Sequence, residues 1–335
     1  MKSLPQETAF LEIGPGQVAV GEGPFTSFFE PPRDANAFYW NDFDLSDPKP
    51  WKVPNTFRMA SNVGQWPIED FPNIEWQPPS LAPFEEAFRA ISAGFGNGAK
   101  LEKLVPFVTE TGRLRSGDLR ALASQALEHG NDCSHAYGHW EATSGFIGIT
   151  PECFLVVRES SLETMALAGT AAPADADRFR NDPKQIREHA LVVEGIREAL
   201  GETVREEARE VLELNGLQHF LTRLRMELTG PVDLNTLIRQ LHPTPAVGFL
   251  PRTEKVFDLH QQIRARLAPP SSFATPFGCW HEGTFHSVVA IRHLSWTGNE
   301  IALPSGCGLI RESELDLEWA ELALKRHVVK QFLNL

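Results

Sequence analysis

The sequence predicts one compact domain, residues 1–335, in which strands and helices follow one another in a mixed order compatible with the α+β class. Its 335 residues, 42% of them hydrophobic, suffice for a large core, although the length would also allow two ordinary domains. The chain contains no repeat, low-complexity tract or long polar linker that would mark a boundary. A single domain is therefore the simpler prediction.

Charge and cysteine content exclude several classes of partner. A net charge of −13 argues against binding to nucleic acid or to an anionic membrane surface, because both would repel an acidic protein. No run approaches the roughly 18 apolar residues of a membrane span, and the first residues form no apolar signal region. Four scattered cysteines fit reduced thiols. We expect a cytoplasmic protein whose substrate, if anionic, needs local cations.

The amino-terminal part predicts short strands followed by a helix. Residues 9–13 and 18–20, joined by a Gly-Pro-Gly turn, are typical of a β-hairpin. Proline and tryptophan are frequent in residues 31–83, so few elements there can be long. Residues 84–91 have helical spacing, and residues 101–107 predict a strand.

Lys103 lies near the start of that strand. A lysine in this position is normally a surface charge, and Lys100 is close enough in the chain to compete with it for any special role. Pro106 interrupts the apolar run that follows.

Two glutamates lie beside predicted buried elements. Residues 145–157 predict two strands around a tight turn that contains Glu152. A carboxyl group between apolar strands is expected to have a raised pKa, which suits a general acid at neutral pH, although an ordinary turn glutamate is the alternative. Asn181 or Asp182 can cap the next long helix, and Glu188 flanks the apolar face of that helix.

The last helix carries a marked polar pattern. Residues 313–316 have the form of a capping box, so the helix is predicted to start there. Glu318, Glu321 and Lys325 share one face because three- and seven-residue spacings bring them to nearly the same angle. Another face is predicted to point inward and consists of Leu317, Ala320, Leu324 and Val328 or Val329.

The elements before this helix supply further polar groups. Residues 287–292 predict a buried strand that ends in Arg292, whose planar guanidinium fits a carboxylate with two hydrogen bonds. Residues 305–310 form a glycine turn with free backbone N–H groups. Two carboxylates and a lysine beside this turn could hold a divalent cation and an anionic ligand together. The alternative is a solvated face with a Glu–Lys pair.

Five segments occur in an order that resembles one enzyme family: 167–170, 187–193, 241–247, 290–292 and 305–310. In sequence and spacing they are similar to the chorismate-binding enzymes, which include the isochorismate, salicylate, anthranilate and aminodeoxychorismate synthases. The resemblance implies the α+β fold of that family, with two packed antiparallel sheets, surrounding helices and an active site in a deep cleft. It covers residues 84–335 as the catalytic core and implies that residues 1–83 are a shortened amino-terminal sheet region.

The same resemblance assigns a role to individual residues. Lys103 would deprotonate the attacking water and Glu152 would be the general acid. Glu188 and Glu321 would bind Mg²⁺, and Glu318 would do so directly or through water. Carboxylate oxygens suit this ion, and no cysteine–histidine cluster competes for a softer metal. The remaining residues would bind the substrate, and they are Gly169, Thr170, Ala246, Arg292, Gly306, Cys307, Gly308 and Lys325.

The implied function is a Mg²⁺-dependent isochorismate synthase that converts chorismate to isochorismate, in menaquinone or siderophore biosynthesis. A salicylate synthase, an ammonia-using enzyme like anthranilate synthase component I, and a non-catalytic chorismate-binding protein are alternatives. Departures from the family pattern at Pro106, residues 171–174 and Thr275 keep the last one open. We expect a monomer or homodimer without a glutaminase partner, because Lys103 and the missing arginine after Gly169–Thr170 both disfavour the ammonia-using enzymes.

Overall fold

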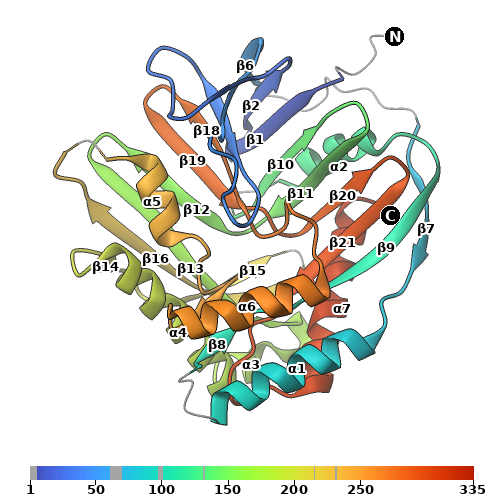
Figure 1. Cartoon of the computed structure of the whole chain (residues 1–335), viewed down its shortest axis with the longest axis vertical. Coiled ribbons are helices and arrows are strands. Elements are labelled where there is room, and N and C mark those ends of the chain that lie inside the picture. Colours follow the sequence, from blue (N-terminus) through green and yellow to red (C-terminus); the bar gives the residue numbers. More distant parts are fainter. Residues whose placement is uncertain (1–5, 61–69, 97–100, 131–132, 215, 231) are drawn as a thin grey trace.

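The computed structural model describes residues 6–60, 70–96, 101–130, 133–214, 216–230 and 232–335. Within these residues the chain forms two large antiparallel sheets and seven α-helices (Figure 1). The predicted α+β fold with two antiparallel sheets is therefore confirmed. Lys100 lies outside the described residues.

The first sheet has nine strands. Its amino-terminal hairpin, β1 with β2, is the one predicted from the glycine turn. In spatial order the strands are β6 (Thr56–Ala60), β2 (Gln17–Glu22), β1 (Thr8–Gly14), β10 (His135–Trp140), β11 (Ser144–Thr150), β20 (His293–Thr297), β21 (Glu300–Gly306), β9 (Phe107–Ser116) and β7 (Asn73–Gln77).

The second sheet has ten strands, and β15 (Glu210–Leu214) pairs with β16 beside the main path. The amino-terminal strands β3 to β5 form one edge of it, just as β1, β2 and β6 form an edge of the first sheet. The main path runs β14 (Arg205–Glu206), β16 (Leu217–Glu227), β13 (Ser161–Ala171), β12 (Cys153–Arg158), β19 (Thr284–Val289), β18 (Pro276–His281), β4 (Ala37–Trp40), β5 (Trp51–Val53) and β3 (Thr26–Phe28).

The two sheets pack face to face over a shared apolar core. Leu11 and Tyr137 of the first sheet meet Phe38 and Phe277 of the second in one buried cluster. Tyr137 and Phe277 are in direct ring contact, with centroids 5.7 Å apart. Burial of these aromatic side chains is the main driving force that holds the sheets together.

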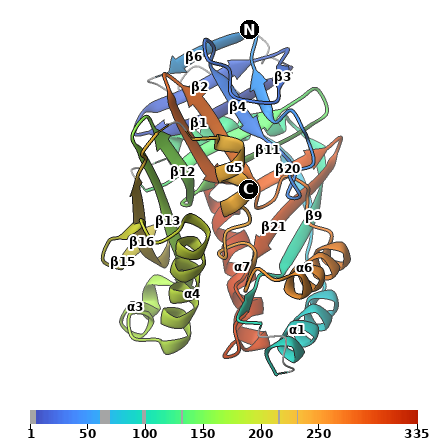
Figure 2. The ribbon, with the colours of Figure 1, turned by 60° about the vertical axis from the view of Figure 1, so that its left-hand side comes forward.

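Helices gather at one end of the molecule. In Figure 2, α3 and α4 lie on one side of this end, and α1, α6 and α7 lie on the other. The helices are α1 (Leu81–Gly96), α2 (Leu122–Glu128), α3 (Ala176–Phe179), α4 (Pro183–Leu200), α5 (Leu234–Leu241), α6 (Glu254–Leu267) and α7 (Leu315–Phe332).

Two of the segments that cross from one sheet to the other are hydrogen-bonded to each other. Glu152 lies between β11 and β12, and Arg292 lies between β19 and β20. The backbone N–H of Val289 donates to the carbonyl of Glu152 at 2.9 Å, and that of Ile149 donates to the carbonyl of Arg292 at 3.2 Å. The tight turn predicted at Glu152 is therefore a switch between sheets, and it lies beside Arg292.

The strand predicted over residues 101–107 is two strands. Lys103–Leu104 forms β8 and pairs with β17 (Phe249–Leu250), whereas β9 starts at Phe107 and pairs with β21 and β7. Pro106 lies between them because proline has no N–H to donate to a strand partner.

The predicted inward face of the last helix is wrong at its amino-terminal end and right at Val328 and Val329, which are both buried. Leu317 is 61% exposed and Ala320 is exposed, whereas Glu318 and Arg326 are buried. The predicted capping box is also absent: the N-cap is Glu314 without a side-chain bond, and Ser313 Oγ instead accepts from the N–H of Ile310. The helix turns its polar face toward the protein because partners for its charged groups lie there.

Candidate active site

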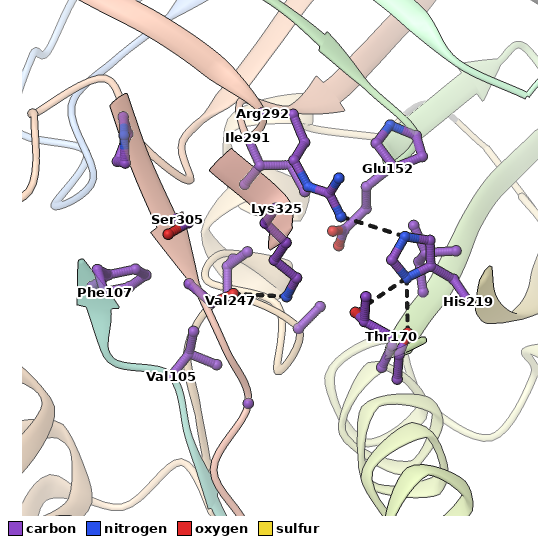
Figure 3. A pocket seen from close by; sticks show the side chains of 18 of the residues that line it. Val105, Phe107, Glu152, Thr170, His219, Val247, Ile291, Arg292, Ser305 and Lys325 are labelled. Atoms are coloured by element: carbon purple, nitrogen blue, oxygen red, sulfur yellow. Dashed lines mark hydrogen bonds between the residues drawn. The ribbon is translucent and has the colours of Figure 1, made fainter. Parts of the chain in front are cut away.

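A cavity lies where the crossovers between the sheets face α4 and α7. Figure 3 shows side chains from both sheets pointing into it. Nine of the predicted site residues line the cavity, namely Glu152, Gly169, Thr170, Glu188, Ala246, Arg292, Gly306, Gly308 and Lys325. These residues are up to 173 positions apart in the sequence, from 152 to 325, and the fold brings them together.

Glu152 is a buried carboxyl group in the cavity wall, 3% exposed. Burial raises its pKa to about 8, and the positive charges of Lys103, Lys325 and Arg292 offset only part of that effect. Thr244 Oγ1 donates to Glu152 Oε1 at 3.4 Å. At neutral pH the group is therefore mostly protonated, as a general acid requires.

Arg292 is held by a histidine that sequence patterns did not identify. His219 Nδ1–H donates to the carbonyl of Gly169 at 2.8 Å, so its Nε2 is free to accept from Arg292 Nη2 at 3.4 Å. Burial lowers the pKa of His219 to about 3 and keeps it neutral, and the Arg292 charge acts in the same direction. Arg292 itself has a positive φ of 56°, which a non-glycine residue adopts only when its surroundings enforce it.

The Gly169–Thr170 turn presents little free backbone. The N–H of Thr170 donates to Gln185 Oε1 at 3.1 Å, and the carbonyl of Gly169 is occupied by His219. Gly169 has φ of 75°, which favours glycine at this position. The Thr170 hydroxyl remains in the cavity wall, 3.4 Å from His219 Nδ1.

Lys103 is fully buried rather than a surface charge, and it pairs with Glu188. Its Nζ donates to Glu188 Oε1 at 2.9 Å. The other oxygen of Glu188, Oε2, accepts from Lys184 at 3.1 Å. Burial alone would raise the pKa of Glu188, but these two ammonium groups outweigh burial and lower it, so Glu188 is a carboxylate.

Gly308 makes room for this pair. A Cβ added to Gly308 would lie 2.5 Å from Lys103 Nζ and closer still to Glu188 Oε1. The predicted glycine turn is an extended segment instead: Gly306 ends β21, and the N–H groups of Cys307 and Leu309 donate to the carbonyls of Pro106 and Leu104. Gly308 allows this segment to pass directly over the ion pair.

Helix α7 contributes the other predicted carboxylates. Glu321 pairs with Lys325 at 2.7 Å, and Lys325 also donates to the carbonyl of Gly306 at 2.7 Å. Glu318 is 2% exposed and pairs with Lys184 through Oε1 at 2.8 Å. Burial raises the pKa of Glu318, and neighbouring acidic groups add to the increase that Lys184 opposes.

These carboxylates fit a magnesium ion chemically. Their donor atoms are all carboxylate oxygens, and Oε2 of Glu318 is buried without a hydrogen-bond partner among the described residues. However, the only group of three acidic, histidine or cysteine ligands within 4.8 Å of one another in the described part of the chain is Glu7, His139 and Glu141. The three predicted ligands are thus separated in this structure, where Lys184 lies between two of them.

Cys307 differs from the other predicted substrate-binding residues. Its side chain is 1% exposed and packs in the apolar cluster under α1 and α6. Its N–H donates to the carbonyl of Pro106 at 3.3 Å. Cys307 is not among the residues that line the cavity, and its N–H, which was predicted to bind the substrate, already donates to Pro106.

The comparisons with known proteins agree on one family. A family model described as "Chorismate binding enzyme" matches residues 117–334. The chain belongs to the chorismate-binding enzyme family.

Several members of this family are similar to the chain. It is 32% identical over 246 residues to the salicylate biosynthesis isochorismate synthase of Pseudomonas aeruginosa, a match that covers 68% of this chain and 47% of that protein. The structure of MenF, the menaquinone-specific isochorismate synthase of Escherichia coli, superposes with a TM-score of 0.79 at 22% identity over 98% of this chain and 89% of that one. Anthranilate synthase component I of Streptococcus pneumoniae superposes with a TM-score of 0.71 at 13% identity, over 99% and 93% of the two chains.

The matches cover only part of the relatives and only part of this chain. The matched region spans about half the length of the curated relatives, 47% of the P. aeruginosa protein and 49% of the isochorismate synthase MenF of Escherichia coli. Lys103 lies before residue 117, where the family match begins.

No helix in the described part of the chain is long and apolar enough to cross a membrane.

Three residues of this family site were missed in the sequence: Lys184, His219 and Thr244. Lys184 precedes Glu188 by four residues, a helical spacing that could have indicated the pair. His219 lies within β16, 73 positions from Arg292, and only the fold reveals their contact.

Proposed function

We propose that this chorismate-binding enzyme is a Mg²⁺-dependent isochorismate synthase. The observation that carries the proposal is the buried, protonated carboxyl of Glu152 in the same cavity as the Arg292 guanidinium and the Glu188 carboxylate. The P. aeruginosa relative, itself named an isochorismate synthase, supports the choice within the family.

In the proposed reaction, water adds to C2 of chorismate while the C4 hydroxyl leaves. The ring double bond shifts between the two positions, so the product is an isomer of the substrate. Lys103 would act as a neutral amine, after losing to solvent the ammonium proton that it directs at Glu188 in this structure. In that form it accepts a proton from the attacking water, and Glu152 gives its proton to the departing hydroxyl as the C4–O bond breaks. The net change is a transfer of hydroxyl from C4 to C2 with no oxidant or reductant.

Positive groups suit the two carboxylates of the substrate. Arg292 would bind the enolpyruvyl carboxylate with two hydrogen bonds, and the neutral His219 holds the guanidinium in place. Lys325 adds a second positive charge at the same wall of the cavity. Fixing both ends of the substrate orients C2 and C4 toward the base and the acid.

Glu188, Glu318 and Glu321 would hold Mg²⁺. The bound ion would offset the charge of the ring carboxylate. The protein contributes the acidic oxygens, and Glu318 Oε2 has no other described partner.

An NMR assay of the purified protein with chorismate tests the proposal. We expect isochorismate with Mg²⁺, none with EDTA, and loss of activity in Glu152→Gln and Lys103→Ala. Glu163→Gln is a matched control, because Glu163 pairs with Arg158 on the exposed part of β13. Salicylate with pyruvate would indicate a salicylate synthase, and turnover only with ammonium salts would indicate an ammonia-using enzyme. Binding of chorismate without any turnover would reject catalysis.

A further inference from the structure

Lys184 lies between two acidic side chains from different helices. Its Nζ is 3.1 Å from Glu188 Oε2, on its own helix α4, and 2.8 Å from Glu318 Oε1, on α7. The side chains of Glu188 and Glu318 are only 7% and 3% exposed, so water screens their mutual repulsion poorly. An ammonium group between them offsets that repulsion and links the two helices.

We propose that Lys184 is an internal counter-cation of this acidic site. Its ammonium group occupies the carboxylate oxygens when no divalent ion is bound, and it competes with a divalent ion for these oxygens. The inference rests on the proposed function in one respect, namely that these carboxylates bind a divalent cation. Its new content is that the affinity of the site for the metal is set by a lysine of the chain itself.

The contacts of Lys184 coincide with those a metal would use. It takes one oxygen from Glu188 and one from Glu318. Glu188 Oε1 is already bound by Lys103, so Oε2 is the oxygen that remains for a cation. Glu318 offers a second, unpartnered oxygen, Oε2, among the described residues. A divalent ion therefore cannot take Glu188 Oε2 and Glu318 Oε1 together until the ammonium leaves them.

Lys184 is also the lysine that is free to leave. Its side chain is 17% exposed and starts in the first turn of α4, whereas that of Lys103 is 1% exposed and enclosed beneath the extended segment at Gly308. A four-carbon stem lets the Lys184 ammonium swing out to solvent while Lys103 keeps its partner.

Removal of the Lys184 charge should have two opposite effects. Metal binding should become tighter, because the ion no longer displaces a competitor. The metal-free protein should become less stable, because Glu188 keeps only Lys103 and the buried Glu318 loses its ammonium partner. A purely structural lysine would produce only the second effect.

Lys184→Met and Lys184→Gln test the proposal, and Lys330→Met is the matched control. Lys330 lies on α7 and pairs with Glu110, so its removal changes the net charge equally without touching the acidic site. Calorimetric titration with Mg²⁺ alone should give at least about tenfold tighter binding for both Lys184 variants, and no change for the control. Their melting temperature should fall in EDTA and recover with Mg²⁺.

Equal or weaker Mg²⁺ binding by the folded Lys184 variants would overturn the proposal. Glu321→Gln separates this failure from a failure of the metal site itself. If Glu321→Gln loses Mg²⁺ binding while Lys184→Met binds like the unaltered protein, the metal site stands and the counter-cation does not. If the unaltered protein and Glu321→Gln bind Mg²⁺ equally, both ideas fall.

A measurement on the unaltered chain covers the case in which the variants do not fold. Lysine acetylation by acetic anhydride, followed by peptide mass spectrometry, reports how often each ammonium is accessible. Mg²⁺ should speed the modification of Lys184 several-fold and leave Lys330 unchanged. No acceleration of Lys184 at a saturating Mg²⁺ concentration would contradict its displacement.

Discussion

Arg292, between β19 and β20, and His219, on β16, form a hydrogen bond in which the guanidinium donates to Nε2 of a neutral imidazole at 3.4 Å. The imidazole is neutral because burial lowers its pKa to about 3, and its other nitrogen donates to Gly169. The neutral imidazole therefore orients the guanidinium and does not offset its positive charge, whereas a carboxylate partner would offset that charge.

His219→Ala should weaken substrate binding more than it slows chemistry. Without the acceptor, the Arg292 side chain can rotate away from the substrate carboxylate, so we expect KM to rise about tenfold and kcat to fall less. Steady-state kinetics with chorismate measure both constants. Mg²⁺ binding should remain unchanged, since His219 contacts none of the acidic ligands. A fall in kcat with constant KM would show that His219 acts on the chemical step instead.

The rate should fall as the pH rises through about 8. Glu152 donates a proton only in its neutral form, and burial raises its pKa to about 8, so its protonated fraction decreases above that value. A profile of kcat/KM against pH should show this decrease in the free enzyme. Glu152→Gln should have little activity at any pH, and an activity that keeps rising above pH 9 would exclude Glu152 as the acid.

Glu152 should also make the stability of the protein depend on pH. Its folded pKa is raised from 4.5 to about 8, so the folded state holds this proton more tightly than the unfolded state. The stabilisation is complete below pH 4.5 and is lost as the pH rises through 8. A glutamine at position 152 cannot titrate. As the pH rises from 4.5 to 8, the melting temperature of Glu152→Gln should therefore rise relative to that of the unaltered protein. A constant difference between the two would contradict the raised pKa.

Gly308→Ala should destroy activity. The added Cβ would collide with the Lys103–Glu188 pair, and both partners are too enclosed to move aside cheaply. We expect at least about a hundredfold loss of kcat/KM and a lower melting temperature. Gly14→Ala is the control, because nothing lies within 4 Å of its added Cβ. Normal activity in Gly308→Ala would mean that the extended segment at Gly308 is more pliable than the structure indicates.

Local sequence patterns predicted well which side chains share one face of a helix and where helices and strands occur. They did not predict what those side chains contact in the folded protein. The spacing of Glu318, Glu321 and Lys325 placed them correctly on one face of α7, yet spacing cannot tell whether that face meets water or a cavity. Leu317 was predicted to be buried because it is apolar, and it is 61% exposed. The family resemblance supplied what the local pattern lacked, since it placed Glu152 and Arg292 in one site.

Contacts between distant elements could not be predicted from single segments. The Lys103–Glu188 pair joins β8 to α4 over 85 positions, and His219, near the start of β16, contacts Arg292 in the segment between β19 and β20. Periodicity within a segment carries no information about such pairs. The spacing of Lys184 and Glu188 could have predicted their pair, but the second contact of Lys184, with Glu318 on α7, depends on how the fold places α7 relative to α4.

The crossovers at Glu152 and Arg292 lie side by side and are joined to each other at the site. The backbone N–H groups of Val289 and Ile149 donate to the carbonyls of Glu152 and Arg292. These hydrogen bonds do not depend on the identity of any side chain. A small rocking of one sheet against the other would carry acid and guanidinium along as a unit and leave their mutual spacing intact. Substitutions in the surrounding loops can therefore reshape the rim of the site while the proton donor and the carboxylate anchor keep their alignment.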